Sequence, residues 1–365
     1  MSKKSPFDLP LLPPPIDLIP LVPEIGKANH LLGRLNGLVF TLPNPDLLIT
    51  PLVTKEAVLS SKIEGTQASL EDVFQYEAAQ LKSENNDAER DIREIINYRK
   101  ALKVALSDIK KRPIGENLIK KMHSILLNSV RGAAKDRGNF RRTQVFIGRQ
   151  GATIDKATFV PPQFNEIPKL ISNWEKFHHA SDALDPLVRI AILHYQFEAI
   201  HPFLDGNGRI GRILIPLSLY ERELLAHPIL YISEYFEENR SIYYQLLLAV
   251  SEDKAWTEWI IFFLKGISIQ SERAENTAKR ILKLYAELKV EVANINSQYA
   301  IRFLDIIFAA PVFSFNSIRD ELGTKAQQTV YNLIEKFMAK GIVKEQGDQK
   351  RNRKFEFPRL LALLD

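Results

Sequence analysis

The stretch His201-Pro-Phe-Leu-Asp-Gly-Asn-Gly-Arg-Ile-Gly-Arg212 decides how this chain of 365 residues is interpreted. Apolar residues recur at helical spacing on both sides of it, over residues 185–200 before it and residues 210–225 after it. That period predicts two helices, so the stretch between them is predicted to be a loop. Gly-Asn-Gly at 206–208 stands where the second helix opens. A helical fold built around this loop is the first prediction.

The residue types in the loop suit the binding of a nucleotide phosphate. Glycines at 206–208 let backbone N–H groups approach a phosphate closely, and the start of a helix adds a favourable dipole. Arg209 and Arg212 stand in the first helical turn, where their guanidinium groups can hold further phosphates. Asp205 is a hard oxygen ligand of the kind that Mg²⁺ prefers. His201, at the edge of this group, is a candidate general base.

Each of these residues also has an ordinary interpretation. A histidine before proline at a helix end is more often a structural hydrogen-bonding residue, and arginines on a helix are usually solvated. A structural metal site made by His201 and Asp205 would have no third ligand close by in the sequence. Taken together, the residues are hard to explain by packing, because Gly-Asn-Gly at a helix start has no role in a core. A functional loop is the preferred interpretation.

All twelve positions of the stretch match the Fic family motif, H-[PX]-F-x-[DE]-G-N-G-R-x-x-R, so the chain resembles that family. Fic proteins mostly transfer AMP from ATP to a hydroxyl group on a target protein. The resemblance implies that His201 is the general base and that Asp205 holds Mg²⁺ or Mn²⁺. It also implies that the rest of the motif binds ATP, namely Gly206, Asn207, Gly208, Arg209, Ile210, Gly211 and Arg212. In-line attack on phosphorus needs positioning, a base and charge neutralisation, which these residue types supply.

A second motif lies upstream, in Ser60-Ser-Lys-Ile-Glu-Gly65, within a predicted helix. It resembles the [ST]-x-x-x-E-[GN] motif of the inhibitory helix in autoinhibited Fic proteins. The resemblance implies that Ser60 and Glu64 are inhibitory, and that Glu64 pairs with Arg212 and keeps the γ-phosphate of ATP from its productive position. A carboxylate is a natural competitor for a guanidinium that holds phosphate. The alternative is an ordinary surface glutamate on a helix that ends at the next glycine.

Residues 143–154 (TQVFIGRQGATI) alternate between apolar and polar side chains around a turn at Gly148-Arg-Gln-Gly151. This pattern predicts a β-hairpin. In Fic proteins a hairpin of this kind, the flap, lies beside the motif and binds the target segment by strand addition. The resemblance implies that a target protein docks at 143–154. A plain surface hairpin is the alternative.

Two tyrosines, Tyr243 and Tyr244, stand at the start of a predicted amphipathic helix after the motif. They resemble the adenine-contacting tyrosines of the family, although tyrosines on a helix more often belong to the core. Some relatives carry an adenine-contacting asparagine seven residues after the second tyrosine, whereas this chain has Ser251. The contact to the adenine base therefore stays open.

The C-terminal region resembles a winged helix-turn-helix. Helices are predicted over 301–309 and 317–322, and a third is predicted from Thr324, as its cap, to Lys340. Two alternating segments, 342–345 and 354–357, are predicted to be strands.

The same region is basic. From residue 277 to the end there are 15 Lys and Arg against 10 Asp and Glu, and this excess of +5 equals the net charge of the whole chain. Lys350, Arg351 and Arg353 fall between the two strands, where basic side chains suit the phosphates of DNA. Many winged helices dock proteins instead, and a modest net charge does not decide between the two.

Composition limits the class of protein. The chain has no cysteine, so disulfides and thiolate metal sites are excluded. Six prolines before Pro23 argue against a signal peptide and favour an extended arm packed on the surface. No apolar run approaches the length of a membrane span. We expect a cytoplasmic protein without a membrane partner. Prolines at 43, 45 and 51 are expected to interrupt the N-terminal helices.

The sequence thus predicts a predominantly α-helical protein in three parts. Residues 1–113 form an N-terminal arm and helical region with the inhibitory motif. Residues 114–266 form a helical Fic catalytic core with the β-hairpin flap. Residues 267–365 form a linker helix and the C-terminal winged helix-turn-helix.

The predicted function is that of a protein adenylyltransferase, autoinhibited by Glu64 and Arg212, that uses ATP with Mg²⁺ or Mn²⁺. Its predicted partners are a target protein and, through self-modification, the protein itself; DNA and a homodimer are left open. The alternatives are de-adenylylation of a modified protein and a nucleotide-sensing regulator that binds DNA.

Overall fold

The computed structural model describes residues 5–40, 45–79, 87–128, 130, 136–148, 151, 153–324, 326–346 and 353–364. Over these residues the chain is mostly helical, as predicted, with a small antiparallel sheet near its C-terminal end. None of the helices in the described ranges combines the length and the apolar character that crossing a membrane requires.

The α-helices are α1 Val22–Phe40, α2 Asp46–Ile63, α3 Leu70–Ala79, α4 Asp87–Asp108, α5 Glu116–Leu126, α6 Ile167–His178, α7 Pro186–Ile200, α8 Asn207–Glu221, α9 Ser233–Glu238, α10 Arg240–Asp253, α11 Trp256–Ala293, α12 Ala300–Ala309, α13 Phe315–Leu322, α14 Gln327–Ala339 and α15 Pro358–Leu364. Short 3₁₀ helices cover Ile19–Leu21, Ile154–Lys156 and Phe164–Glu166, and the strands are β1 Val312–Ser314, β2 Lys344–Gln346 and β3 Lys354–Glu356.

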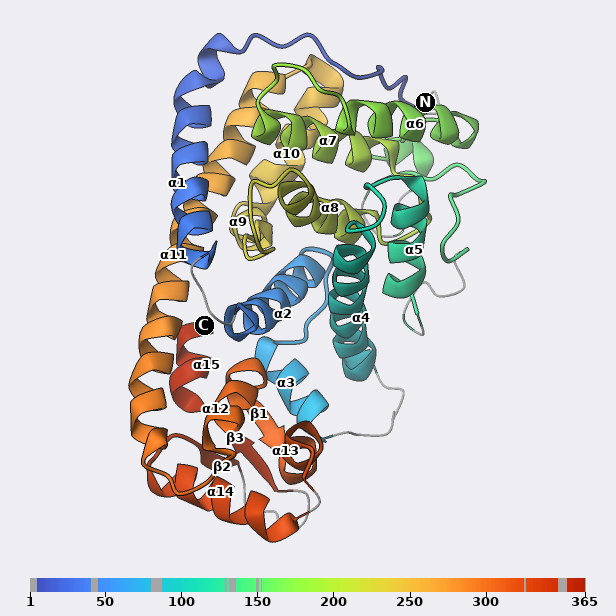
Figure 1. The fold of residues 1–365 in the computed structure, drawn as a ribbon. Coiled ribbons are helices and arrows are strands. Elements are labelled where there is room, and N and C mark those ends of the chain that lie inside the picture. The colour runs from blue at the N-terminus through green and yellow to red at the C-terminus, as the bar shows by residue number, and fades with distance from the viewer. Residues whose placement is uncertain are drawn as a thin grey trace.

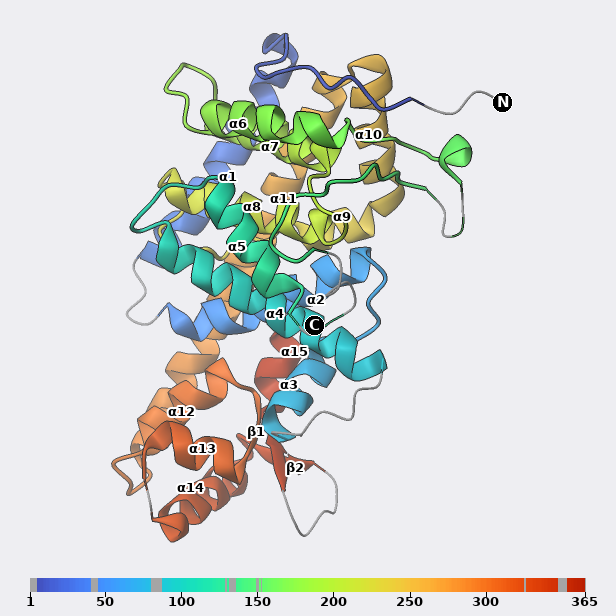
Figure 2. The same cartoon turned by 90° about the vertical axis from the view of Figure 1, so that its right-hand side faces the viewer.

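The long helix α11 runs along one side of the whole molecule (Figure 1). It packs against α1 and α7 in the helical core and against α12 and α15 at its other end. Helix α2 lies between these two parts, as a second view also shows (Figure 2). It contacts α4, α8 and α9 on the core side, and α12 and α15 on the other.

Helix α7 occupies the centre of the core. Its N-terminus is capped by Asp185, whose carboxylate accepts the backbone N–H groups of Leu187 at 2.8 Å and Val188 at 3.3 Å. Nearly all of its residues are buried, which is typical of a helix surrounded by others. Because α7 and α8 pack against each other, the loop between them is fixed at both ends.

The N-terminal arm packs on the core as predicted. Leu9 and Leu12 are buried, and the Leu12 N–H donates to Asn173 Oδ1 on α6 at 2.7 Å. The Gln196 amide on α7 donates to the Pro10 carbonyl at 2.9 Å. An extended proline-rich segment has few internal hydrogen bonds, so its order depends on contacts of this kind.

Residues 300–364, called here the C-terminal unit, run in the order α12, β1, α13, α14, β2, β3, α15. The sheet has the order β1-β3-β2 with antiparallel pairs, and Phe355 of β3 faces Phe313 on one side and Glu345 on the other. The three helices α12, α13 and α14 and the two strands β2 and β3 follow one another in the predicted order, whereas α15 was not predicted. Strand β1 was not predicted, because three residues are too short to show a period. Residues 347–352, including Lys350 and Arg351, lie outside the described residues.

Two local predictions in these regions are wrong. Pro51 does not interrupt α2, which continues from Asp46 to Ile63. Leu48 and Leu52 on either side of it are buried, so their packing outweighs the one backbone hydrogen bond that proline removes.

Thr324 does not cap α14, which begins only at Gln327. Its hydroxyl accepts the Ala326 N–H at 3.3 Å, two residues on, so it belongs to the turn between α13 and α14. Gly323, with φ 66°, ends α13 immediately before this turn.

Candidate active site

The loop between α7 and α8 is held by its own residues and by α5. His201 caps the end of α7 in a left-handed conformation, with φ 49° and ψ 60°. Asn207 braces the loop, because its Oδ1 accepts the Phe203 N–H and its Nδ2 donates to the Phe203 carbonyl, both at 2.9 Å. His123 of α5 hydrogen-bonds the Asp205 carbonyl through Nε2 at 3.0 Å, and its ring stacks on Phe203.

The start of α8 presents free donors as predicted. Gly206 precedes the helix with φ 77°, a conformation that favours glycine. The helical hydrogen bonds begin with Ile210 N–H to Gly206 O at 3.1 Å. The three preceding N–H groups, at 207–209, have no place in that series, and they are the groups to which the sequence analysis assigns the anion site. The Asn207 side chain, which binds Phe203, is not part of it.

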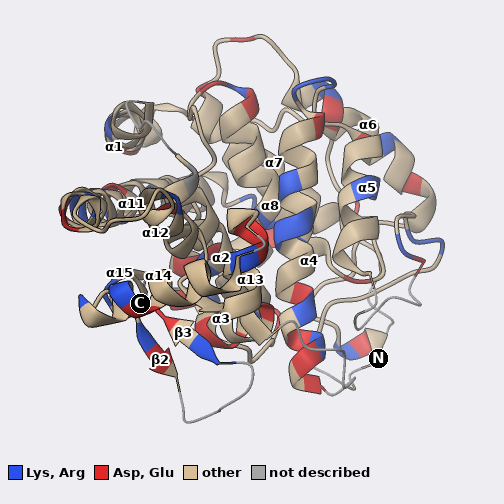
Figure 3. Cartoon of the chain, turned by 60° about the horizontal axis from the view of Figure 1, so that its bottom comes forward, with Lys and Arg blue, Asp and Glu red and all other residues tan. Residues whose placement is uncertain are grey.

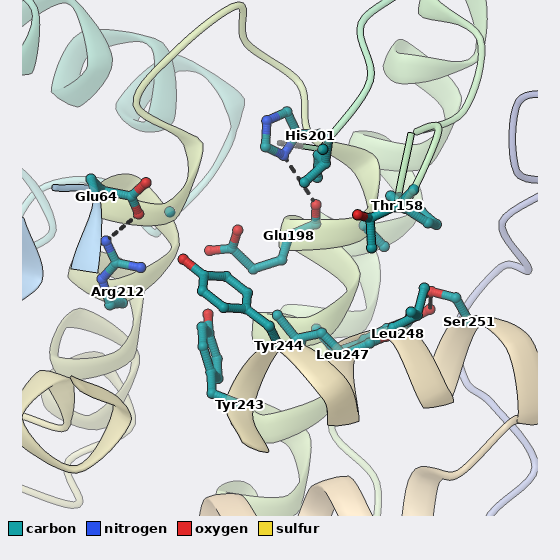
Figure 4. Close-up of a pocket in the computed structure, with 16 residues that line it drawn as sticks. Glu64, Thr158, Glu198, His201, Arg212, Tyr243, Tyr244, Leu247, Leu248 and Ser251 are labelled. Carbon is teal, nitrogen blue, oxygen red and sulfur yellow. Dashed lines mark hydrogen bonds and ion pairs between the residues drawn. The ribbon is translucent and has the colours of Figure 1, made fainter. Parts of the chain in front are cut away.

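A cavity of about 470 Å³ lies beside this loop (Figure 4). Its lining includes five of the predicted nucleotide-site and catalytic residues, namely His201, Gly208, Arg212, Tyr243 and Tyr244, together with Glu64. The other predicted residues are not in the lining: Ser60, Asp205, Gly206, Asn207, Arg209, Ile210 and Gly211. Ile210 is fully buried, so its side chain belongs to the core.

His201 is a neutral base in this environment. Burial lowers its pKa to about 4, although the Glu198 carbonyl, 3.4 Å from Nδ1, acts in the opposite direction. A carbonyl can only accept, so Nδ1 carries the hydrogen and Nε2 keeps its lone pair. The ring therefore has the tautomer in which Nε2 can take a proton.

Arg212 is almost completely buried and is bound to α2. Its Nε donates to Ser60 Oγ at 2.8 Å, and its Nη2 donates to the Ser60 carbonyl at 2.9 Å and to Glu64 Oε1 at 2.6 Å. Burial opposes the charge on Glu64, but the Arg212 guanidinium outweighs it and lowers the pKa of that carboxyl. The predicted contact between the two motifs is present (Figure 4).

Gly208 gives this ion pair its room. A Cβ at this position would overlap Glu64 Oε1 and would lie 2.9 Å from Arg212 Nη1. Movement of Glu64 Oε1 away from such a Cβ would disturb its hydrogen bond to Arg212 Nη2. A glycine here therefore leaves space for the contact between Glu64 and Arg212.

Arg209 is oriented differently from Arg212. Its Nη1 donates to Glu94 Oε2 of α4 at 2.8 Å, and its Nη2 lies 3.4 Å from Asp205 Oδ1. Asp205 keeps a partly exposed side chain next to the start of α8. One accessible carboxylate beside a phosphate site fits Mg²⁺, which usually takes its remaining ligands from phosphate and water.

The two tyrosines have different environments. Tyr243 is buried, and its hydroxyl is 2.9 Å from His194 Nε2. Tyr244 is 44% exposed and faces the cavity, so it is the one available to a ligand. Ser251 also lines the cavity, with its Oγ 2.9 Å from the Tyr195 hydroxyl.

The hairpin closes later than predicted. Ile147 pairs with Phe159, donating its N–H to the Phe159 carbonyl at 2.8 Å. Ile154, expected at the end of the second strand, instead begins the 3₁₀ helix Ile154–Lys156. The turn prediction at 148–151 was too short, and its residues 149 and 150 lie outside the described residues. Ile147 and Phe159 both line the cavity, so the segment still borders the site.

Four residues that matter here were not found from the sequence: Glu94, His123, Arg141 and Glu198. The Arg141 guanidinium is buried and donates to the carbonyls of His201 at 2.9 Å, Thr143 at 3.1 Å and Pro162 at 2.6 Å. It thereby joins the loop to the base of the hairpin. No spacing signal could reveal these residues, because their partners come from distant elements.

Comparisons with known proteins give one consistent result. A family model described as Fic/DOC family N-terminal matches residues 22–107, and one described as Fic/DOC family matches residues 113–219. The protein adenylyltransferase Fic of Drosophila grimshawi is 33% identical over 117 residues, which are 32% of this chain and 21% of the relative. The chain thus matches about a fifth of the length of that relative.

Solved structures share the fold. A Fic family protein from Desulfovibrio desulfuricans G20 superimposes with a TM-score of 0.58 at 20% identity, covering 95% of this chain and 98% of that one. Fic-1 from C. elegans gives a TM-score of 0.54 at 22% identity, covering 73% of this chain and 75% of that one. The two family models together match more than half of the chain, and both matched segments contribute residues to the cavity beside the motif. The chain belongs to the Fic/DOC family.

Proposed function

We propose that this protein transfers AMP from ATP to a hydroxyl group of a target protein, and that Glu64 inhibits the transfer. The observation that carries the proposal is the meeting of a neutral His201 and the buried Arg212 in one cavity beside the start of α8. A base, a cation and free backbone donors are what in-line attack on phosphorus requires. The relatives named protein adenylyltransferase support the same activity.

The chemical step is a substitution at the α-phosphorus of ATP. The target oxygen forms a bond to this phosphorus while the bond to the β-phosphate bridging oxygen breaks, and pyrophosphate leaves. His201 Nε2 takes the proton of the attacking hydroxyl. His201 has a left-handed backbone conformation at the end of α7 and lines the cavity.

The charges of ATP are held by the start of α8. Backbone N–H groups at 207–209 bind α- and β-phosphate oxygens, and Arg212 binds an outer phosphate. Asp205 would hold Mg²⁺, which when bound neutralises phosphate charge. Arg209 is itself held by an ion pair with Glu94, and it keeps the Asp205 carboxylate in place through a second ion pair.

Glu64 occupies the position that an outer phosphate needs. Its carboxylate takes the Arg212 Nη2 donor at 2.6 Å, so ATP that binds in this state lacks that partner. The α-phosphate is then held in an orientation that the target hydroxyl cannot attack in line. Release of Glu64 is therefore the activating step.

The test is transfer of labelled AMP from ATP, with the protein itself and a cell lysate as acceptors. Glu64→Gly protein should label itself and a lysate protein, and Glu64→Gly/His201→Ala protein should label neither. Equal labelling by both variants would contradict the proposal. Mass spectrometry of the labelled bands would identify the target and the type of hydroxyl.

Removal of AMP from a modified protein is the second candidate. It is favoured by the Glu64 carboxylate, which is ionised and lines the same cavity as His201, where it can orient a water molecule. The two activities respond oppositely to one change. Glu64→Gly should increase transfer, whereas it should abolish removal of AMP from a pre-labelled protein.

A further inference from the structure

Two carboxyl groups face Arg212 inside the cavity, and only one is bound to it. Glu64, at the C-terminal cap of α2, forms the ion pair described above. Glu198 of α7 also lines the cavity, but its Oε1 is buried and has no hydrogen-bond partner in the described part of the chain. Its carboxyl group points towards Arg212 and the end of Tyr244, away from Ser251 (Figure 4).

The structure makes room for this second carboxyl group. A Cβ at Gly211 would overlap Glu198 Oε1 and would lie 3.3 Å from its Cδ. Gly208, three residues earlier on α8, makes room for Glu64 in the same way. Two glycines on one helix thus each admit one carboxyl group, with Arg212 next in the chain. This repetition argues against an accidental position for Glu198.

A charged carboxylate at this position would oppose the proposed ligand. ATP must replace Glu64 at Arg212, and it brings several negative charges close to Glu198. An unpaired buried carboxylate is unfavourable even before that, because it has lost its hydration. A neutral carboxyl group has neither difficulty, and it gains an O–H donor for a phosphate oxygen.

We propose that Glu198 is a nucleotide-binding residue that acts as a neutral acid, donating its O–H to a phosphate oxygen of bound ATP. The inference rests on the proposed function, since it concerns the same cavity. It adds a ligand-contacting residue that lies outside the motif loop. Binding of ATP is then coupled to uptake of a proton wherever Glu198 is ionised in the free protein.

The groups around Glu198 leave it as the one that changes charge near neutral pH. Burial raises the pKa of Glu198 to about 7, with Arg212 acting against this rise and Glu64 adding to it. His201 has its pKa lowered to about 4, mainly by burial, and stays neutral. Burial raises the pKa of Tyr243 and Tyr244 on α10, which also stay neutral.

The sign of the pH effect follows. Bound phosphate stabilises the protonated form of Glu198, so the pKa of this residue is higher in the complex than in the free protein. The extra affinity is fully present below about pH 7 and is lost as the pH rises, by up to about tenfold per pH unit. An amide at this position cannot take up a proton, so it removes the effect.

The experiment measures ATP binding by calorimetry in Glu64→Gly protein, where the competing carboxylate is absent. Because Glu64 adds to the raised pKa of Glu198, its removal moves the pH dependence to lower pH, so binding is measured from about pH 5.5 to about pH 8.5. The dissociation constant should rise with pH by up to about tenfold per pH unit, and proton uptake should appear as a difference between buffers of unequal ionisation enthalpy. Glu64→Gly/Glu198→Gln protein should show a much smaller rise. Any ionisation of ATP itself is common to both proteins, so their difference reports Glu198 alone.

Glu56→Gln in the same Glu64→Gly protein is the matched control. Burial raises the pKa of Glu56 to about 7 as well, but this residue binds Tyr98 and Ser233 and is not part of the cavity lining. The control should keep the full pH dependence.

Three results would overturn the inference. The first is an equal pH dependence with and without Glu198→Gln. The second is loss of ATP binding by Glu198→Gln near pH 6 at an unchanged melting temperature, which would require a charged carboxylate. The third is failure of Glu64→Gly protein to bind ATP at any pH, which would overturn the proposed function too. AMP transfer without pH-linked binding would leave the proposed function standing.

Discussion

The motif loop and the C-terminal unit both carry many charged side chains, but they use them differently. At the loop, Arg209 and Arg212 are only 4% and 1% exposed, and each is paired with a carboxylate from a distant part of the sequence. In the C-terminal unit, acidic and basic residues lie side by side on the surface strands (Figure 3). Lys344 there is 63% exposed in its side chain and pairs with Glu356 at 2.7 Å. Further surface pairs are Arg353–Glu345, Arg359–Glu287 and Lys340–Glu291.

The difference shows where charge carries information about function. A buried arginine cannot lose its partner without another anion taking its place, so it can act as a binding site or a switch. An exposed pair contributes about 0–1 kcal/mol and can rearrange freely. Several basic side chains of the C-terminal region are thus paired with acidic neighbours, so their presence is weak evidence for DNA binding.

The largest effect should come from His201. In Glu64→Gly protein, His201→Ala should lower the rate of AMP transfer by about 10² to 10⁴, because a positioned base is lost. ATP binding should change little, since the phosphates are held by α8. Single-turnover transfer and calorimetry measure the two quantities. His30 on α1 is exposed, so His30→Ala serves as the control variant. An unchanged rate for His201→Ala would show that His201 is not the general base.

Asp205 should come next. Asp205→Ala should lower transfer by about 10- to 100-fold at ordinary Mg²⁺ concentrations, with partial recovery as Mg²⁺ is increased. Excess EDTA should abolish transfer by the unmodified protein. Asp253→Ala, at the exposed end of α10, is the control. Full activity in EDTA would exclude the proposed metal ligand.

Glu64→Gly should increase transfer by about 10- to 100-fold. A hydrogen bond to a charged group contributes about 1.5–3 kcal/mol, and 1.36 kcal/mol corresponds to about tenfold. Glu64→Gln, which keeps the size and loses the charge, should give an intermediate rate. The measurement is self-labelling at matched ATP and Mg²⁺ concentrations.

A double variant sharpens this result. Arg212→Ala should be poorly active, because the partner of the outer phosphate is gone. Glu64→Gly/Arg212→Ala should resemble it, since Glu64 inhibits only through Arg212. An ordinary stabilising ion pair predicts a lower melting temperature for Glu64→Gly and no gain in rate, which would contradict the switch.

The pH profile tests the burial of His201. With a pKa of about 4, His201 stays unprotonated until the pH falls through that value. Transfer at saturating ATP should therefore change by less than about twofold between about pH 7.5 and 5.5, where an unshifted histidine would lose about tenfold. A loss beginning near pH 6.5 would place His201 in a more solvated environment.

The smallest effect is expected in the C-terminal unit. Arg353→Ala removes a pair with Glu345 that is partly exposed, so the free energy of unfolding should fall by no more than about 1 kcal/mol. Chemical denaturation measures this change in the free energy of unfolding.

If the C-terminal unit binds duplex DNA, the binding should be strongly salt-dependent, and replacing Lys350, Arg351 and Arg353 together should weaken it. No binding at low salt would favour a protein-docking role.

The sequence determined the chemistry of the loop. Helical periodicity, the glycines and the order of residues in the motif are local properties, so the loop and its helices could be assigned from the residues alone. The pairing of Glu64 with Arg212 was expected only from the resemblance to the inhibitory motif of Fic proteins. The three helices and the last two strands near the C-terminus could be predicted from the same local properties, whereas β1 and α15 could not. Cap residues were less reliable, as Thr324 shows, because a hydroxyl can bond to a turn as easily as to a helix start.

Only the tertiary structure decided which distant groups meet at the site. Glu94, His123 and Arg141 reach the loop from other elements, and Ile147 pairs with Phe159 instead of a nearer residue. Glu198 belongs to a helix whose apolar pattern gives no reason to single it out. Whether a charged side chain is buried beside a partner or left alone depends on the packing of several helices at once. That packing sets the pKa of His201 and Glu198, because desolvation depends on everything that surrounds a group and not on its place in the chain.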